Sequence, residues 1–297
     1  MRKKFLAVMT AAVITTMAFT GCGSSSNDKT TDAGTNASTA LSGDISVISR
    51  EDGSGTRGAF VELMGIVDDQ DNDITTQTAE ITNSTSVMLK TVSQNEKSIG
   101  YVSLGSLSTD VKTLKVDGAE ATAENVKAGS YKVSRPFNIC YKEDKLSDLD
   151  KDFISYVMSE EGQKIVNDEG YIGLTPEGKY TGSKQKGKIK LAGSTSVSPL
   201  MDKIKDAYTA INPDVTIEIQ ESGSSAGIQA ATEGAAQIGM SSRELKDEEL
   251  SAGLTSKQIA MDGIAVIVNN ANPLTDITSD QIKGIYTGET TKWEDVK

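Results

Sequence analysis

One segment near the start of the chain combines the residue types that hold a tetrahedral oxyanion. It reads Arg-Glu-Asp-Gly-Ser-Gly-Thr-Arg at residues 50–57. An alternating apolar run at 45–49, typical of a strand, precedes it, and an apolar-periodic stretch at 58–66, typical of a helix, follows it. Ser54 and Thr56 are residue types that cap helices, and the free N–H groups of a helix start attract anions.

Arg50 adds a guanidinium, which makes paired, charge-assisted hydrogen bonds with oxyanions. We expect Asp52 to hold that guanidinium in place, and Gly53 and Gly55 to let the backbone turn tightly. An ordinary capped turn with a surface Arg–Asp pair has the same letters, so the interpretation depends on the rest of the chain.

Hydroxyl-rich loops of the same kind recur in the second half of the chain. They read Gly-Ser-Thr-Ser at 193–196, Ser-Gly-Ser-Ser-Ala-Gly at 222–227 and Gly-Met-Ser-Ser-Arg at 239–243. Each follows a predicted strand, and the first two precede predicted helices. Serine-rich helix caps are common in purely structural roles, but strand exits in α/β folds gather at the ligand crevice. Four such loops therefore predict one shared anion site.

Signals of strand and helix alternate along the chain, which indicates an α/β architecture. One or two helices are expected over 146–167, and a strand is expected at 264–268. Residues 175–188 lack apolar periodicity and are predicted to be a linker.

The first 22 residues have the pattern of an export signal, with Arg2 and two lysines before an apolar stretch that ends at Cys22. The ending resembles a bacterial lipobox, in which Cys22 becomes the lipid-modified first residue; a plain secretory signal with a chance cysteine is the alternative. Residues 23–43 are small and polar, and we expect a flexible tether. With Cys22 lipidated, Cys140 has no partner for a disulfide within the chain.

Composition excludes several classes of function. The chain has 30 basic and 42 acidic residues, a net charge of −12, which argues against a nucleic-acid partner. It has no histidine, so a histidine zinc site and a Ser–His–Asp triad are both excluded. No dinucleotide or P-loop motif is present, and we expect no cofactor. Asp69, Asp71 and Asp73 alternate as in a calcium loop but lack its glycine and distal glutamate, so we expect a solvated loop and no metal.

The motif Gly-x-Ser-x-Gly at 223–227 is the one feature that points to an enzyme, with Ser225 as its nucleophile. Without histidine, only a lysine such as Lys90 or Lys97 is left to activate it. We expect no enzyme, although a serine hydrolase and an adhesion or signalling lipoprotein on the same scaffold stay open as alternatives.

Taken together, these motifs resemble those of the phosphate-binding proteins of bacterial phosphate ABC transporters. The resemblance covers nearly all of 44–297, and it rests on the four loops together with Ile-Gly-Tyr-Val at 99–102, Asp-Gly-Ile-Ala-Val-Ile-Val-Asn at 262–269, and Ile-Tyr-Thr-Gly at 285–288 with Trp293. It implies two α/β lobes joined by crossing hinge strands, which close over one phosphate. It also implies a lipid-anchored, extracytoplasmic monomer that delivers phosphate to the permease of an ABC importer.

Carried over motif by motif, the resemblance implies a set of phosphate ligands. They are Arg50, Ser54, Gly55, Thr56, Thr195, Ser196, Ser224 and Ser242, with Asp52 supporting Arg50. Ser242 is a departure, because the best-known members have an aspartate there that accepts the proton of hydrogen phosphate and repels sulfate. Binding of another tetrahedral oxyanion such as sulfate is therefore the alternative.

The order of the motifs also departs from the family, in which the segment matching 50–57 comes last. The sequence therefore predicts a circular permutant in which 175–188 joins the ancestral ends; a truncated tandem of two copies is the alternative. The permutant has one continuous lobe over 137–262 and a second lobe built from 44–136 and 263–297. We expect the chain to cross between the lobes near 134–137 and 262–264.

Overall fold

The computed structural model describes residues 41–182 and 184–296. Its strands are β1 (Ser46–Arg50), β2 (Glu80–Thr82), β3 (Ser98–Ser103), β4 (Val111–Thr113), β5 (Lys115–Val116), β6 (Ser134–Tyr141), β7 (Lys186–Gly193), β8 (Asp214–Glu221), β9 (Ile238–Ser241), β10 (Thr255–Asn269) and β11 (Asp276–Ile277). Its α-helices are α1 (Gly55–Leu63), α2 (Thr85–Gln94), α3 (Ala123–Lys127), α4 (Asp148–Met158), α5 (Glu160–Asp168), α6 (Ser198–Ile211), α7 (Ser224–Glu233), α8 (Asp247–Ser251) and α9 (Ser279–Thr287). Short 3₁₀ turns are η1 (Leu104–Ser106), η2 (Glu143–Lys145) and η3 (Trp293–Asp295). The predicted export signal, the lipidation of Cys22 and most of the predicted tether lie outside the described residues.

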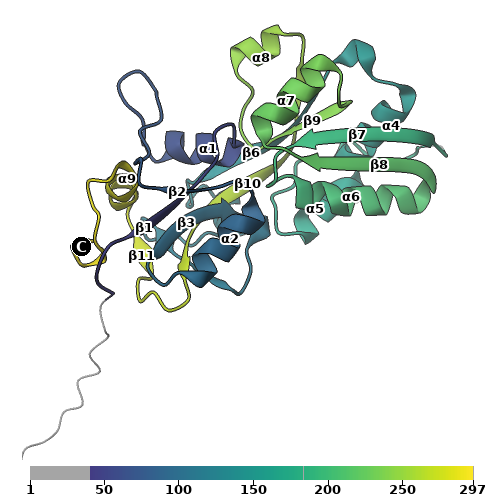
Figure 1. The fold of residues 1–297 in the computed structure, drawn as a ribbon. Helices are drawn as coiled ribbons and strands as arrows, with labels where there is room; N and C mark the ends of the chain where they lie inside the picture. The colour runs from purple at the N-terminus through teal and green to yellow at the C-terminus, as the bar shows by residue number, and fades with distance from the viewer. Residues whose placement is uncertain (1–40, 183, 297) are drawn as a thin grey trace, which may run out of the picture. The chain divides into compact units, whose positions relative to one another are not determined.

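Within this part of the chain, nine strands form one mixed sheet (Figure 1). Their order is β2-β1-β3-β10-β6-β9-β7-β8, and β4 also pairs with β10. The first half of β10 pairs antiparallel with β6, from Thr255 opposite Tyr141 to Gly263 opposite Ser134. Its second half pairs with β3 and β4. The long strand β10 is therefore shared by both halves of the sheet.

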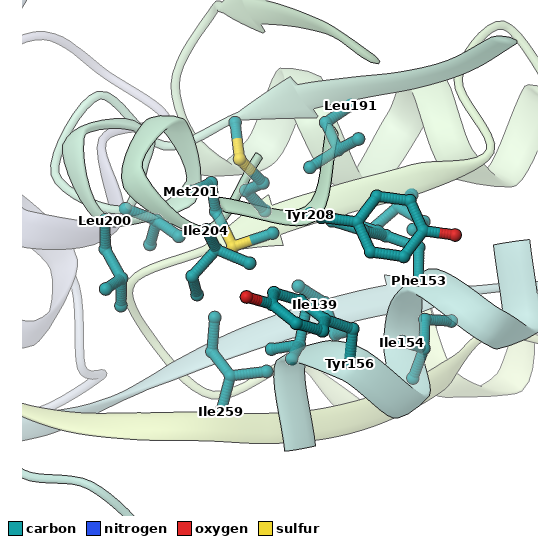
Figure 2. Packing of buried hydrophobic residues seen from close by; sticks show 14 of the residues in the cluster. Ile139, Phe153, Ile154, Tyr156, Leu191, Leu200, Met201, Ile204, Tyr208 and Ile259 are labelled. Carbon is teal, nitrogen blue, oxygen red and sulfur yellow. The ribbon is translucent and has the colours of Figure 1, made fainter. Parts of the chain in front are cut away.

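Buried apolar side chains form separate cores in the two halves. The buried members of the core around α4, α6 and β7, part of which is shown in Figure 2, all fall within residues 137–260. The cores around β1, β3 and the second half of β10 draw their buried members from 47–133 and 264–293. In the first core, the rings of Phe153 and Tyr208 meet edge to face with centroids 5.1 Å apart. The molecule thus has the two-lobed α/β architecture that the sequence predicts, with a separate core in each lobe.

Of the one or two helices expected over 146–167 the structure has two, and two other predicted elements differ in extent from those observed. The stretch 146–167 forms two helices, α4 and α5, because Ser159 caps a new helix by accepting a hydrogen bond from the Gly162 N–H. The predicted linker 175–188 is shorter than expected, because parallel pairing with β8 starts β7 at Lys186. The strand predicted at 264–268 begins at Thr255, since its polar first half pairs with β6.

An ion pair is buried where β6 and β10 run between the two cores. Arg135 and Asp262 are 2% and 0% exposed, with Arg135 Nη2 3.1 Å from Asp262 Oδ2. Asp262 also accepts hydrogen bonds from the Ser103 hydroxyl at 2.9 Å and from the Leu104 N–H at 3.1 Å. Burial nevertheless raises the pKa of Asp262 to about 6, and it lowers the pKa of Arg135. Desolvation of both charges therefore outweighs their mutual attraction.

This raised pKa predicts how stability changes with pH. The stabilising contribution of protonated Asp262 is complete below the ordinary aspartate pKa near 4 and is lost as pH rises through about 6. We expect the free energy of unfolding of the wild type, relative to Asp262→Asn, to fall by about 2 kcal/mol between pH 4 and pH 7. Urea unfolding over this pH range measures the difference, and Asp144→Asn, at an exposed side chain, is the control. A difference that does not vary with pH would contradict the assignment.

Candidate functional site

The predicted oxyanion ligands come from four loops and meet in one buried cluster. Arg50 ends β1 and Ser54 caps α1, with its hydroxyl accepting from the Arg57 N–H at 3.4 Å. Thr195 and Ser196 lie between β7 and α6, Ser224 begins α7 and Ser242 follows β9. The predicted ligands are all buried, with the side chains of Arg50, Ser54, Thr56, Thr195, Ser196, Ser224 and Ser242 each 6% exposed or less.

Arg50 joins the two lobes at this cluster. Its Nη2 donates to the Thr195 hydroxyl at 3.0 Å. Its Nε and Nη2 each lie 2.8 Å from one carboxylate oxygen of Glu51, which makes a bidentate ion pair. The backbone of Arg50 is also held, because its N–H donates to the Tyr101 hydroxyl at 3.2 Å. Burial raises the pKa of Tyr101 to about 12, so this hydroxyl stays protonated at neutral pH.

The expectation that Asp52 supports Arg50 is wrong, because Glu51 takes that role. The longer side chain of Glu51 reaches around to two nitrogens of the guanidinium. Asp52 lies in the turn that follows, with its side chain 98% exposed, and pairs with Arg57 at 2.9 Å. Arg57 in turn donates to the Arg50 carbonyl at 2.9 Å and to Asp73 at 2.7 Å. Asp52 therefore pairs with Arg57, which holds the backbone of Arg50, and it does not contact the Arg50 guanidinium.

Hydroxyl groups continue the seam between the lobes. The Thr56 and Ser196 hydroxyl oxygens are 2.8 Å apart, and the Ser225 N–H donates to the Gly53 carbonyl at 3.1 Å. The Ser224 hydroxyl lies 3.3 Å from that of Ser242 and accepts from the Ser242 N–H at 3.1 Å.

Glycine permits the closest approach of the two lobes. A Cβ on Gly55 would clash with the Ser224 hydroxyl and lie 2.7 Å from the Ser242 hydroxyl. Gly223 precedes α7 with φ +84°, a left-handed conformation that favours glycine. Both residues therefore have a geometric reason to lack a side chain.

The arrangement suits a small tetrahedral anion. Helices α1, α6 and α7 begin at or next to the clustered loops, and the N-terminal ends of helices carry partial positive charge. Hydroxyls can donate to an oxyanion or accept its proton, and the Arg50 guanidinium supplies a full positive charge. The site thus offers donors from both lobes and one cation.

Three residues at the site were missed by the sequence prediction. Glu51 holds Arg50, Ser194 donates its hydroxyl proton to Ser242 Oγ at 2.9 Å, and Thr85 lies 3.3 Å from Thr195 Oγ1 and 3.2 Å from Ser196 Oγ through its own Oγ1. A signal for Thr85 was available, because Ser-Thr-Ser at 84–86 precedes an apolar-periodic stretch just as the other loops do.

The surroundings of Ser225 differ from those of a serine nucleophile. Its hydroxyl accepts a hydrogen bond from Arg243 Nη2 at 3.1 Å, and Arg243 is paired with Glu249 at 2.8 Å. Arginine stays protonated in proteins and cannot act as a general base. The hydrogen bond from Arg243 therefore indicates a structural role for Ser225 at the boundary between the lobes.

A groove of about 570 Å³ opens beside the hydroxyl cluster. Ser54 belongs to both the hydroxyl cluster and the groove. The rest of the groove is lined mainly by the outer face of α1, by Ser134–Pro136 and by residues 243–246. Among the described residues, no group of three His, Cys, Asp or Glu side chains is placed to hold a metal ion, and no helix is both long and apolar enough to cross a membrane.

The described residues form a two-lobed α/β protein with a buried cluster of hydroxyls and one guanidinium between its lobes, and comparison with known proteins identifies its family. The PBP superfamily domain matches residues 25–161 and 178–297. Phosphate-binding protein PstS 2 of Streptococcus agalactiae serotype V is 50% identical over 264 residues, which are 88% of this chain and 90% of that protein. Phosphate-binding protein PstS of Staphylococcus saprophyticus is 33% identical over 127 residues, 40% of each chain.

The fold of this chain is also similar to that of a protein whose crystal structure is known. That of a phosphate-binding protein of a phosphate ABC transporter from Streptococcus pneumoniae TIGR4 has a TM-score of 0.69 at 47% identity, and the match covers 86% of this chain and all of the other. The chain belongs to the PBP superfamily and, within it, to the family of the PstS phosphate-binding proteins.

The close approach at Gly55 gives a testable prediction. A methyl group there would push Ser224 and Ser242 away and keep the lobes from meeting, so we expect Gly55→Ala to weaken phosphate binding at least tenfold. Gly58→Ala, in the same helix, is the matched control, because its new methyl would meet only Arg243 Cδ at 3.7 Å, an ordinary contact. Titration calorimetry of both variants measures the effect. Equal affinities would show that the lobes do not need this approach.

Proposed function

We propose that this protein captures inorganic phosphate between its lobes and delivers it to an ABC importer. The observation that carries the proposal is the convergence of Arg50 with hydroxyls from four separate loops, drawn from both lobes, in one buried cluster. Hydroxyl and N–H donors replace the hydration shell of phosphate, and the guanidinium offsets part of its charge. PstS relatives named as phosphate-binding proteins, similar over nearly nine tenths of the chain, support the same ligand.

We propose eight residues as phosphate ligands. They are Arg50, Ser54, Gly55, Thr56, Thr195, Ser196, Ser224 and Ser242. Glu51 keeps Arg50 oriented, as its paired contacts of 2.8 Å indicate. The contact of Ser225 with Arg243 favours binding over ester hydrolysis, and no catalytic role is proposed.

The proposed cellular setting follows from the sequence. A lipid on Cys22 would anchor the protein at the outer face of the cell membrane, and residues 23–43 would let the lobes move relative to that anchor. The partner is the transmembrane permease of the importer, and the protein acts as a monomer. The pneumococcal relative of known structure is the phosphate-binding protein of a phosphate ABC transporter, which supports the importer assignment.

We also propose that the chain is a circular permutant with lobes at 137–262 and at 44–136 plus 263–297. The separation of the cores at these positions supports the boundaries. The segments at 44–45 and 291–292, near the two ends of the described range, are adjacent, because the Ile45 N–H donates to the Thr291 carbonyl at 2.8 Å and Asp44 pairs with Lys292. The partial match with the staphylococcal relative, over 40% of each chain, is expected for shared segments in a different order.

Removing the guanidinium tests the proposed ligand. We expect Arg50→Ala to weaken phosphate binding by about tenfold to a hundredfold, because a charge-assisted hydrogen bond is lost and Glu51 is left without its cation. Lys246→Ala is the control, since it removes one positive charge from an exposed side chain beside the groove. Titration calorimetry with inorganic phosphate measures both. Unchanged affinity in Arg50→Ala would refute the site.

Ser242 allows a test of anion selectivity. Its side chain is fully buried and lies against the Ser194 and Ser224 hydroxyls, so a carboxylate there would face the same anion. We expect Ser242→Asp to weaken sulfate binding more than tenfold relative to phosphate, because a carboxylate accepts the proton of hydrogen phosphate and repels sulfate. Competition of sulfate with phosphate at pH 7 measures this ratio. A ratio equal to that of the wild type would mean that another group senses the proton.

A further inference from the structure

Thr85 lies among the proposed ligands although its loop is outside the motifs that define them. It begins α2, and its side chain is 5% exposed. The strand before it, β2, runs parallel to β1 with Thr82 opposite Arg50. The carboxyl ends of both strands therefore reach the same edge of the sheet, and the turn after β2 brings Thr85 to the cluster.

The N–H and hydroxyl groups of Thr85 contact the opposite lobe. The backbone N–H donates to Thr195 Oγ1 at 3.4 Å. The hydroxyl oxygen lies 3.3 Å from Thr195 Oγ1 and 3.2 Å from Ser196 Oγ. The cap of α2 is made by a different residue, since the Ser84 hydroxyl accepts from the Val87 N–H at 3.2 Å. The Thr85 hydroxyl is therefore not used to cap α2.

These contacts decide what Thr195 and Ser196 do with their protons. Thr195 Oγ1 accepts from Arg50 Nη2 and from the Thr85 N–H, so its acceptor capacity is used and its own proton is left to donate, either to a ligand or to Thr85 Oγ1 at 3.3 Å. Ser196 Oγ lies between the hydroxyls of Thr56 and Thr85, and either can supply a proton to it. An oxyanion needs donors, and acceptor lone pairs facing it would repel it.

We propose that Thr85 is a positioning residue of the phosphate site, which holds the Thr195 and Ser196 hydroxyls in the donor orientation that phosphate requires. The N–H of Thr85 fixes Thr195, and its hydroxyl fixes Ser196. The start of α2 becomes a fifth chain segment of the site, from the lobe that also supplies Arg50 and Thr56. This inference rests on the proposed phosphate function.

The test compares three substitutions by titration calorimetry of the full chain with inorganic phosphate. Thr85→Val keeps the shape and the N–H but removes the hydroxyl, and we expect at least a tenfold loss of affinity. Thr85→Ser restores a hydroxyl and should bind within about threefold of the wild type. Ser86→Ala is the matched control, because it removes an exposed hydroxyl one residue further along the same helix.

Urea unfolding without phosphate separates positioning from folding, and we expect Thr85→Val to unfold in one cooperative transition with a midpoint only slightly below that of the wild type, because two buried polar contacts are lost. A Thr85→Val affinity equal to the wild type, or a Thr85→Ser variant as weak as Thr85→Val, would overturn the positioning role. A wild type that does not bind phosphate would instead refute the proposed function.

Discussion

A guanidinium that is 2% exposed has to find partners within the protein, and the surroundings of Arg50 follow from this requirement. Glu51 neutralises it from its own lobe, and Thr195 accepts from it across the seam. The Tyr101 hydroxyl accepts from its backbone N–H, and the ring of Tyr101 stacks on Phe60 with centroids 4.0 Å apart. The core of one lobe thus sets the position of the charge that faces the other.

The two lobes are held together in different ways along their boundary. At β6 and β10 the link is a continuous backbone ladder with the buried pair of Arg135 and Asp262. At the cluster of hydroxyls around Arg50 the link is a set of polar contacts, each worth about 1 kcal/mol net. Because the apolar cores of the described residues do not extend across that seam, separating the lobes there would break polar contacts and leave the cores intact.

The overall charge of the chain opposes the proposed binding of an anion, so the proposed site has to attract it through short-range contacts. A net charge of −12 repels an approaching anion at long range. Exposed charges separated by more than about 8 Å are largely screened at physiological salt, whereas a buried guanidinium and oriented N–H groups act at short range in a medium of low polarity. The proposed ligands fit this second case, because they are buried and their positions are set by packing.

Local sequence patterns determined the α/β alternation, the helix start capped by Ser54, the helix start near Ser224, and the four hydroxyl-rich loops that come together. These features depend on neighbouring residues, through capping, glycine turns and the period of apolar side chains. What only the tertiary structure decided is which side chains reach one another across space. Glu51 and not Asp52 holds Arg50, because side-chain length and the exposure of the turn choose between adjacent carboxylates. Thr85 joins the site because β2 pairs beside β1, and β10 extends back to Thr255 because β6 lies next to it. Pairing between strands that are distant in the sequence leaves no periodic signal in either segment. It therefore depends on how the chain packs in three dimensions.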